Sequence, residues 1–174
     1  MPTRMSPIAA LAGAALALGG CGSQAPGVEP APSGGATAAS VPTTPKPPPA
    51  LATKPVVVVP GGPPPTKLVV KDLVPGTGKV LAAGQTITVN YVGVLYKGGK
   101  EFDSSWQRNQ PFSTALSPGS VIKGWVQGLP GMRVGGRREL IIPPSLGYGK
   151  AGSPPTIPPN STLIFVVDLL STSG

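Results

Sequence analysis

The sequence lacks histidine altogether and has a single cysteine, Cys21. Without histidine there can be no Ser-His-Asp triad and no Cys-His pair, and histidine-ligated metals and a histidine pH switch are excluded as well. A lone cysteine cannot form a disulfide within the chain. The chemistry of this protein must therefore use other groups, and we expect no metal, nucleotide or redox cofactor.

Acidic residues and clusters of basic residues are also scarce. The chain carries 14 Lys and Arg against 6 Asp and Glu, which gives a formal net charge of +8. The basic residues are dispersed, and Arg137-Arg138 is their only adjacent pair. A nucleic-acid-binding surface needs a clustered basic stripe, so we expect no nucleic acid partner. Weak attraction to an anionic membrane surface stays open.

Aromatic residues are few: two Trp, three Tyr and three Phe. All of these except Tyr96 and Trp106 belong to one set of large apolar residues spaced around a single acid. Gly-rich turns and a Pro-rich loop accompany the set, which favours a dry concave pocket with one carboxylate. Such a pocket can catalyse a reaction that needs no nucleophile. The set comprises Tyr91, Phe102, Asp103, Phe112, Val121, Ile122, Trp125, Tyr148, Ile157 and Phe165.

Glycine and proline, at 25 residues each, exceed average usage. The prolines are densest before residue 66, and Lys46-Pro47-Pro48-Pro49 and Gly62-Pro63-Pro64-Pro65 favour polyproline II. Low hydrophobicity and the absence of periodicity predict a disordered linker over residues 21–66, with Val56–Val59 an edge strand at most. We interpret this linker as a spacer. A partner-binding Pro-rich tract is the alternative.

The first twenty residues are typical of an export signal. Arg4 precedes an apolar stretch from Ile8 to Leu18, which is shorter than the roughly 20 residues needed to span a bilayer. Leu18-Gly19-Gly20-Cys21 resembles the lipobox of bacterial lipoproteins, in which the cysteine is acylated after cleavage. The resemblance implies a lipoprotein signal peptide over residues 1–20 and lipidation, such as palmitate, at Cys21. An ordinary secretory signal is the alternative.

Residues 67–174 are long enough for one compact core. Strands are predicted at 67–73, 85–96, 138–142 and 161–170, the last apolar enough to be buried on both faces. A helix is predicted at 121–129, where four apolar residues share one face between Pro-Gly pairs. These elements predict an α+β fold, a curved antiparallel sheet wrapped around one short helix.

Four stretches of this domain resemble the FKBP family of peptidyl-prolyl cis-trans isomerases. The motifs occur in the family's order and spacing, and the likeness covers roughly residues 67–174. It implies the same architecture and the same activity. The stretches are Val89–Gly93; Glu101–Ser105 followed by Asn109–Phe112; Val121–Trp125; and Leu146–Gly149 through Ile157–Leu163.

The implied reaction suits a pocket without a nucleophile. Rotation about a peptide C–N bond has a barrier of about 18–20 kcal/mol because the bond has partial double-bond character. X–Pro isomers differ by only about 0.5–1 kcal/mol, yet they exchange in tens to hundreds of seconds. The twisted amide has less charge separation than the planar one, so a dry, weakly polar pocket favours it without proton transfer or a covalent intermediate.

The resemblance also assigns roles to residues. It implies a catalytic set in which Trp125 forms the floor, the Tyr148 hydroxyl bonds the substrate chain and the Asp103 carboxylate lies near the reacting amide. Arg108 and Tyr91 match the residues that hold this carboxylate. The catalytic set is completed by Phe112 and Phe165.

The remaining implied residues bind the substrate. Val121 and Ile122 close one side, and the Ile122 backbone N–H is the family's donor to a ligand carbonyl. Ile157 overhangs the site. The substrate-binding set is Tyr91, Phe102, Arg108, Val121, Ile122 and Ile157.

Three positions depart from the family pattern. Ser153 stands where many members carry histidine, Thr156 replaces an apolar residue, and Trp106 occupies an often basic position. We expect these residues at the rim, where they would alter substrate or macrolide preference.

The leading hypothesis is therefore a monomeric, lipid-anchored isomerase outside the cytoplasm, acting on proline-containing exported or cell-envelope proteins and open to macrolide inhibitors. Two other classes stay open. One is a binding module for proline-containing segments with little turnover, because one fold can host several functions. The other is a surface lipoprotein whose active part is the Pro-rich stalk.

Overall fold

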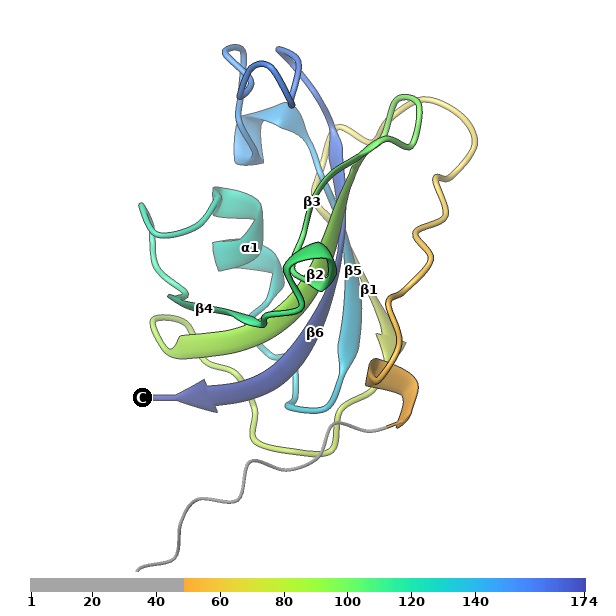
Figure 1. Ribbon diagram of the computed structural model, residues 1–174. Helices are drawn as coiled ribbons and strands as arrows, with labels where there is room; N and C mark the ends of the chain where they lie inside the picture. Colours follow the sequence, from red (N-terminus) through yellow and green to blue (C-terminus); the bar gives the residue numbers. More distant parts are fainter. Residues whose placement is uncertain (1–48) are drawn as a thin grey trace, which may run out of the picture. The chain divides into compact units, whose positions relative to one another are not determined.

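The computed structural model describes residues 49–174 (Figure 1). The predicted signal peptide at 1–20, the predicted lipidation site Cys21 and the predicted linker up to residue 48 lie outside the described residues. No helix within 49–174 has the length and apolar character needed to cross a membrane.

The described chain forms six strands, one α-helix and three short 3₁₀ helices. The strands are β1 (Val69–Val74), β2 (Thr86–Leu95), β3 (Glu101–Ser104), β4 (Phe112–Ala115), β5 (Arg137–Ile142) and β6 (Leu163–Ser173). The helix is α1 (Lys123–Gly128), and the 3₁₀ helices are η1 (Pro49–Leu51), η2 (Trp106–Arg108) and η3 (Pro144–Leu146).

All six strands belong to one antiparallel sheet in the order β1-β5-β6-β2-β3, with β4 also paired to β2. β2 and β6 pair along their length, from Thr86 opposite Ser173 to Leu95 opposite Leu163. α1 covers one face of the curved sheet (Figure 1). The predicted α+β class, a curved antiparallel sheet around one short helix, is confirmed.

The predicted strands and helix are all present, with ends that shift by up to three residues. β3 and β4 were not among the predicted elements. The two strands pair with successive halves of the same edge of β2, β4 with its first half and β3 with its second. The segment between them therefore leaves the sheet, and it carries η2.

The sheet is apolar on both faces. Ile87, Val89 and Tyr91 of β2 belong to the main core cluster beneath α1, whereas Val92 and Val94 belong to a second cluster on the opposite face. The centre of β6 is buried on both faces, as predicted. We call the second group the back-face cluster; it consists of Val92, Val94, Tyr96, Ile141 and Ile164.

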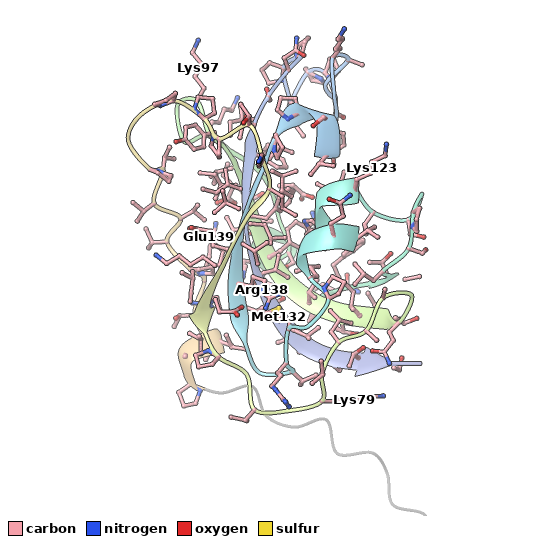
Figure 2. The ribbon with its side chains drawn as sticks, turned by 180° about the vertical axis from the view of Figure 1, so that it is seen from behind. Lys79, Lys97, Lys123, Met132, Arg138 and Glu139 are labelled. Carbon is pink, nitrogen blue, oxygen red and sulfur yellow. The ribbon has the colours of Figure 1, made fainter. Side chains whose placement is uncertain are left out.

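Residues 49–66, which we call the strap, differ from the predicted disordered linker. Leu51 of the strap is only 1% exposed, and Val57 and Val59 pack against the back-face cluster. The strap runs along the side of the sheet opposite α1 (Figures 1 and 2). Its placement has a physical reason, because an apolar sheet face is stabilised when another segment removes it from water.

Candidate active site

A pocket of about 480 Å³ opens on the face of the sheet that α1 covers. Trp125 of α1 contributes a buried ring, while Phe112 and Tyr148 lie at the more open edge, 37% and 40% exposed. The lining contains six apolar residues among eleven, and the others include one carboxylate and one guanidinium. It consists of Tyr91, Phe102, Asp103, Arg108, Phe112, Ser120, Val121, Ile122, Trp125, Tyr148 and Phe165.

Four pairs of aromatic rings in the pocket meet edge to face. The centroid of Trp125 lies 5.4 Å from those of both Tyr91 and Phe165, with interplanar angles of 82° and 84°. Phe102 and Phe165 are also 5.4 Å apart, at 85°, and Tyr91 and Phe112 are 5.9 Å apart, at 74°. This arrangement suits the ring quadrupoles and fixes the rings against one another. The result is a rigid apolar surface.

The helix that carries Trp125 lies close to the sheet. Gly124 permits this approach, because a Cβ on it would lie 2.6 Å from the Ile142 side chain. Arg138 of β5, labelled in Figure 2, donates to the carbonyls of Gly128, Leu129 and Pro130 at 2.9, 3.4 and 3.2 Å. A cation at these carbonyls stabilises a helix C-terminus.

Ile122, at the entry to α1, is one of the residues that line the pocket. Ile122 precedes the helix with extended dihedral angles, φ −64° and ψ 150°. Within residues 49–174, no backbone carbonyl accepts a hydrogen bond from the Ile122 backbone N–H. A carbonyl oxygen bound in the pocket can therefore accept one.

Asp103 is held by two partners. The Tyr91 hydroxyl donates to Oδ2, and Arg108 Nη1 donates to Oδ1 at 2.6 Å. Arg108 Nη2 also donates to the Tyr91 hydroxyl oxygen at 2.8 Å. Burial raises the pKa of Asp103, but the hydrogen bonds from Tyr91 and Arg108 and the charge of Arg108 outweigh it, so this pKa lies below its ordinary value. Asp103 is therefore ionised at neutral pH.

The two tyrosines of the pocket stay protonated. Burial, followed by the hydrogen bond to Asp103, raises the pKa of Tyr91 to about 12. Burial and the nearby charge of Asp103 also raise the pKa of Tyr148. Both hydroxyls therefore remain donors under physiological conditions, and both tyrosines line the pocket.

Buried serines attach β3 to β2 beside the carboxylate. Ser105 Oγ accepts a hydrogen bond from the Tyr91 backbone N–H at 2.9 Å and donates to Asn90 Oδ1 at 3.1 Å. Ser104 Oγ donates to the Tyr91 carbonyl at 3.2 Å. These contacts fix the point at which the chain leaves the sheet towards Arg108. The sequence motifs contain all three polar residues, but sequence reasoning gave them no role.

The structure brings together every predicted pocket residue except Ile157. That residue was expected to overhang the site, but its side chain is buried in the main core cluster. Two backbone hydrogen bonds join Ser153 and Ile157, at 2.8 and 2.9 Å, and close a tight turn there. Ser120 lines the pocket and was missed, because a serine in a Pro-Gly turn has no distinguishing signal.

Trp106 also lies elsewhere than expected. It was expected at the rim, but it packs against the back-face cluster on the other side of the sheet. The rim positions Ser153 and Thr156 are exposed in the loop after Tyr148 and do not line the pocket.

A second hollow, of about 620 Å³, lies between the strap and the loop before β6. Its lining includes four prolines, among them Pro60, Pro64 and Pro158, together with Tyr96 and Lys97. No carboxylate lines this larger hollow. The 480 Å³ pocket, which contains Asp103, is therefore the better candidate for catalysis. Within the described residues, no group of three or more His, Cys, Asp or Glu side chains is placed to hold a metal ion.

Comparison with known proteins identifies the domain. Residues 78–170 match the family model of the FKBP-type peptidyl-prolyl cis-trans isomerases. The chain is 54% identical over 105 residues to an FK506-binding protein of Streptomyces anulatus, covering 60% of this chain and 85% of the relative. It is 50% identical over 103 residues to an FK506-binding protein of Neisseria meningitidis serogroup A, covering 59% and 94%.

The solved structures agree. The crystal structure of AtFKBP13 superimposes with a TM-score of 0.58 at 40% identity, covering 63% of this chain and 96% of that one. The fold, the aromatic pocket and the matched family model define a peptidyl-prolyl cis-trans isomerase. Within that class, the chain belongs to the FKBP family. The family and the enzymatic activity predicted from the sequence are thereby confirmed.

Proposed function

We propose that the pocket accelerates X–Pro rotation by binding the twisted amide more tightly than the planar one. The observation that carries this proposal is the ionised Asp103, held by Tyr91 and Arg108 at the edge of a pocket floored by Trp125. The indole surface takes the proline ring. No group in the pocket needs to exchange a proton or form a bond with the substrate.

The charge of Asp103 supports the same preference. In a planar amide the carbonyl oxygen carries more negative charge than in a twisted one, because conjugation transfers charge from nitrogen to oxygen. A carboxylate near that oxygen therefore destabilises the planar amide more than it destabilises the twisted amide. Only such differential stabilisation lowers the barrier. The Ile122 N–H and the Tyr148 hydroxyl would bind carbonyls outside the rotating bond and so position the peptide.

A protease-free assay on a short X–Pro peptide tests this mechanism. We expect Asp103→Val to lower kcat/KM by about tenfold or more, and Tyr148→Phe to lower it by a smaller factor. Glu139→Gln is a control outside the pocket lining, and it should retain wild-type kcat/KM. Unchanged turnover in Asp103→Val would refute the role of the carboxylate. Retained capture of proline-containing polypeptide by an inactive variant would favour a binding module instead.

We further propose that the enzyme acts on exported or cell-envelope proteins from a lipid anchor at Cys21. The sequence of residues 1–21 supports this, because it combines an export signal with a lipobox-like ending. Two or more acyl chains anchor a protein stably. Metabolic labelling with a fatty acid should mark the wild-type protein and not Cys21→Ala. Equal labelling of both proteins, or of neither, would contradict the anchor.

The relatives named as FK506-binding proteins support macrolide binding in the same pocket. Titration with FK506 should inhibit isomerisation and protect the domain against thermal unfolding, since a ligand that binds only the native state stabilises it. Inhibition without any shift in Tm would count against binding to the folded pocket.

A further inference from the structure

The strap contacts the hairpin that carries the catalytic carboxylate. Lys54 Nζ lies 2.8 Å from Glu101 Oε2, at the first residue of β3. At the turn of the hairpin, a Cβ on Gly99 would lie 3.3 Å from the Val59 side chain. Figure 2 shows Lys97 at this end of the hairpin, and the strap passes beside it. The strap therefore contacts the hairpin both at its turn and at the start of β3.

β3 needs such support because of its place in the sheet. It is a four-residue strand at the end of the strand order, paired with β2. It carries Phe102 and Asp103, both of which line the pocket. A short edge strand has few backbone hydrogen bonds to fix it, so its side chains depend on other contacts.

The same contacts extend to η2, which carries Arg108. Gln107 Nε2 donates to Glu101 Oε1 at 2.7 Å, so Glu101 joins the strap to η2. Trp106, the first residue of η2, packs against the back-face cluster, as do Val57 and Val59 of the strap. The strap thus contacts β3 directly, and it is linked to η2, which carries Arg108, through Glu101 and the back-face cluster.

We propose that the strap is a positioning element for isomerisation, which holds β3 and η2 so that Asp103 and Arg108 keep their geometry at the pocket. This inference rests on the proposed role of Asp103. The strap precedes the residues matched by the family model. It therefore adds a control on catalysis that the family match does not contain.

Apolar packing carries most of this effect. The Lys54 and Glu101 side chains are 42% and 24% exposed, and an ion pair in such a setting contributes little by itself. Val57 and Val59 are partly buried and pack against the back-face cluster. The intervening Val56 and Val58 are 88% and 71% exposed. The strap therefore offers inward and outward valines of identical chemistry.

This alternation allows a matched experiment on the full chain. In Val57→Ser/Val59→Ser we expect kcat/KM on an X–Pro peptide to fall about three- to tenfold, because small displacements of catalytic groups are costly. We expect Val56→Ser/Val58→Ser to behave as wild type. The acidic limb of the pH–kcat/KM profile should also move to higher pH in the inward variant alone, because Asp103 would lose part of its contact with Arg108. Acid unfolding of a destabilised chain would also move that limb, so the profiles are compared only over the pH range in which both variants remain folded.

If the inward variant, Val57→Ser/Val59→Ser, does not fold, reversing the charges of the Lys54–Glu101 ion pair provides a second test. We expect Lys54→Glu to lower kcat/KM about twofold and Lys54→Glu/Glu101→Lys to restore it, consistent with a weak exposed pair. A folded inward variant with wild-type kcat/KM and pH profile overturns the proposal. If the inward variant is unfolded, wild-type kcat/KM in Lys54→Glu overturns the proposal as well. An unaffected Asp103→Val chain would instead overturn the proposed mechanism, so the two failures are distinguishable.

Discussion

Tyr91 takes part in three functions of the site at once. Its ring meets Trp125 edge to face, its hydroxyl donates to Asp103, and its backbone N–H donates to Ser105. One residue of β2 therefore connects the apolar floor, the carboxylate and the strand pairing. A substitution that weakens one of these contacts should also weaken the other two, because contacts sharing one residue are energetically coupled.

The ionisation of Tyr91 gives a first prediction. Its pKa is raised from 10.0 to about 12, first by burial and then by the hydrogen bond to Asp103. Because the folded pKa is the higher one, the stability contributed by Tyr91 is complete below pH 10 and is lost as the pH rises towards 12. Denaturant unfolding at stepwise pH should show a steeper alkaline loss for wild type than for Tyr91→Phe. Identical slopes in the two proteins would contradict the assignment.

Gly93 gives a second prediction at this scale. A Cβ on Gly93 would lie 2.7 Å from Phe102 and 2.9 Å from Phe165. Gly93→Ala must displace these two rings, so we expect a loss of about 1–3 kcal/mol in the free energy of unfolding and weaker peptide binding. Gly61→Ala is the control, because its Cβ would meet no atom within 4 Å. Denaturant unfolding and peptide titration measure both effects, and an unchanged Gly93→Ala chain would show that the rings are not fixed.

At the scale of elements, the predictability of the structure follows the strength of the local pattern. The helix at Trp125 is predictable because its apolar residues repeat at helical spacing between Pro-Gly pairs. β3 and β4 are not predictable, because each has four residues and neither has a sustained alternation. The pocket residues are predictable from motif order. The turn that buries Ile157 depends on loop hydrogen bonds that no local pattern encodes.

Arg138 gives the element-scale prediction. It is buried, pairs with Asp72 of β1 at 2.6 Å and donates to three carbonyls at the end of α1. Arg138→Met keeps the length of the side chain but removes these charged hydrogen bonds. We expect a loss of about 2–3 kcal/mol in the free energy of unfolding, together with lower kcat/KM because Trp125 is less firmly placed.

The control for this prediction is Arg133→Met, which removes an exposed arginine with one hydrogen bond to the Gly78 carbonyl at 3.2 Å. Its effect on the free energy of unfolding should stay within about 0.5 kcal/mol. Equal losses in the two variants would mean that the contact between Arg138 and α1 contributes nothing specific.

For the molecule as a whole, the two faces of the sheet serve different purposes. One face carries α1 and the pocket, and the other carries the back-face cluster beneath the strap. Sequence alone suggests that residues 21–66 are linker, because prolines bracket the apolar residues there. The position of the strap is decided by long-range packing, since β2 and β6 leave both faces of the sheet apolar. A segment without periodicity can still be held in place when it covers such a face.

Two deletions test this boundary of the folded unit. Removing residues 26–48 leaves every strap contact described above in place, so we expect the free energy of unfolding to stay within about 0.5 kcal/mol of wild type. Removing residues 26–65 also removes Leu51, which is fully buried, together with the valines on the back-face cluster. Loss of a buried leucine side chain alone costs about 2–5 kcal/mol. We therefore expect the longer deletion to lower the free energy of unfolding by more than about 2 kcal/mol. Denaturant unfolding of both chains decides the matter, because equal stability would show that the strap adds nothing to the domain and that its folded unit begins only after residue 65.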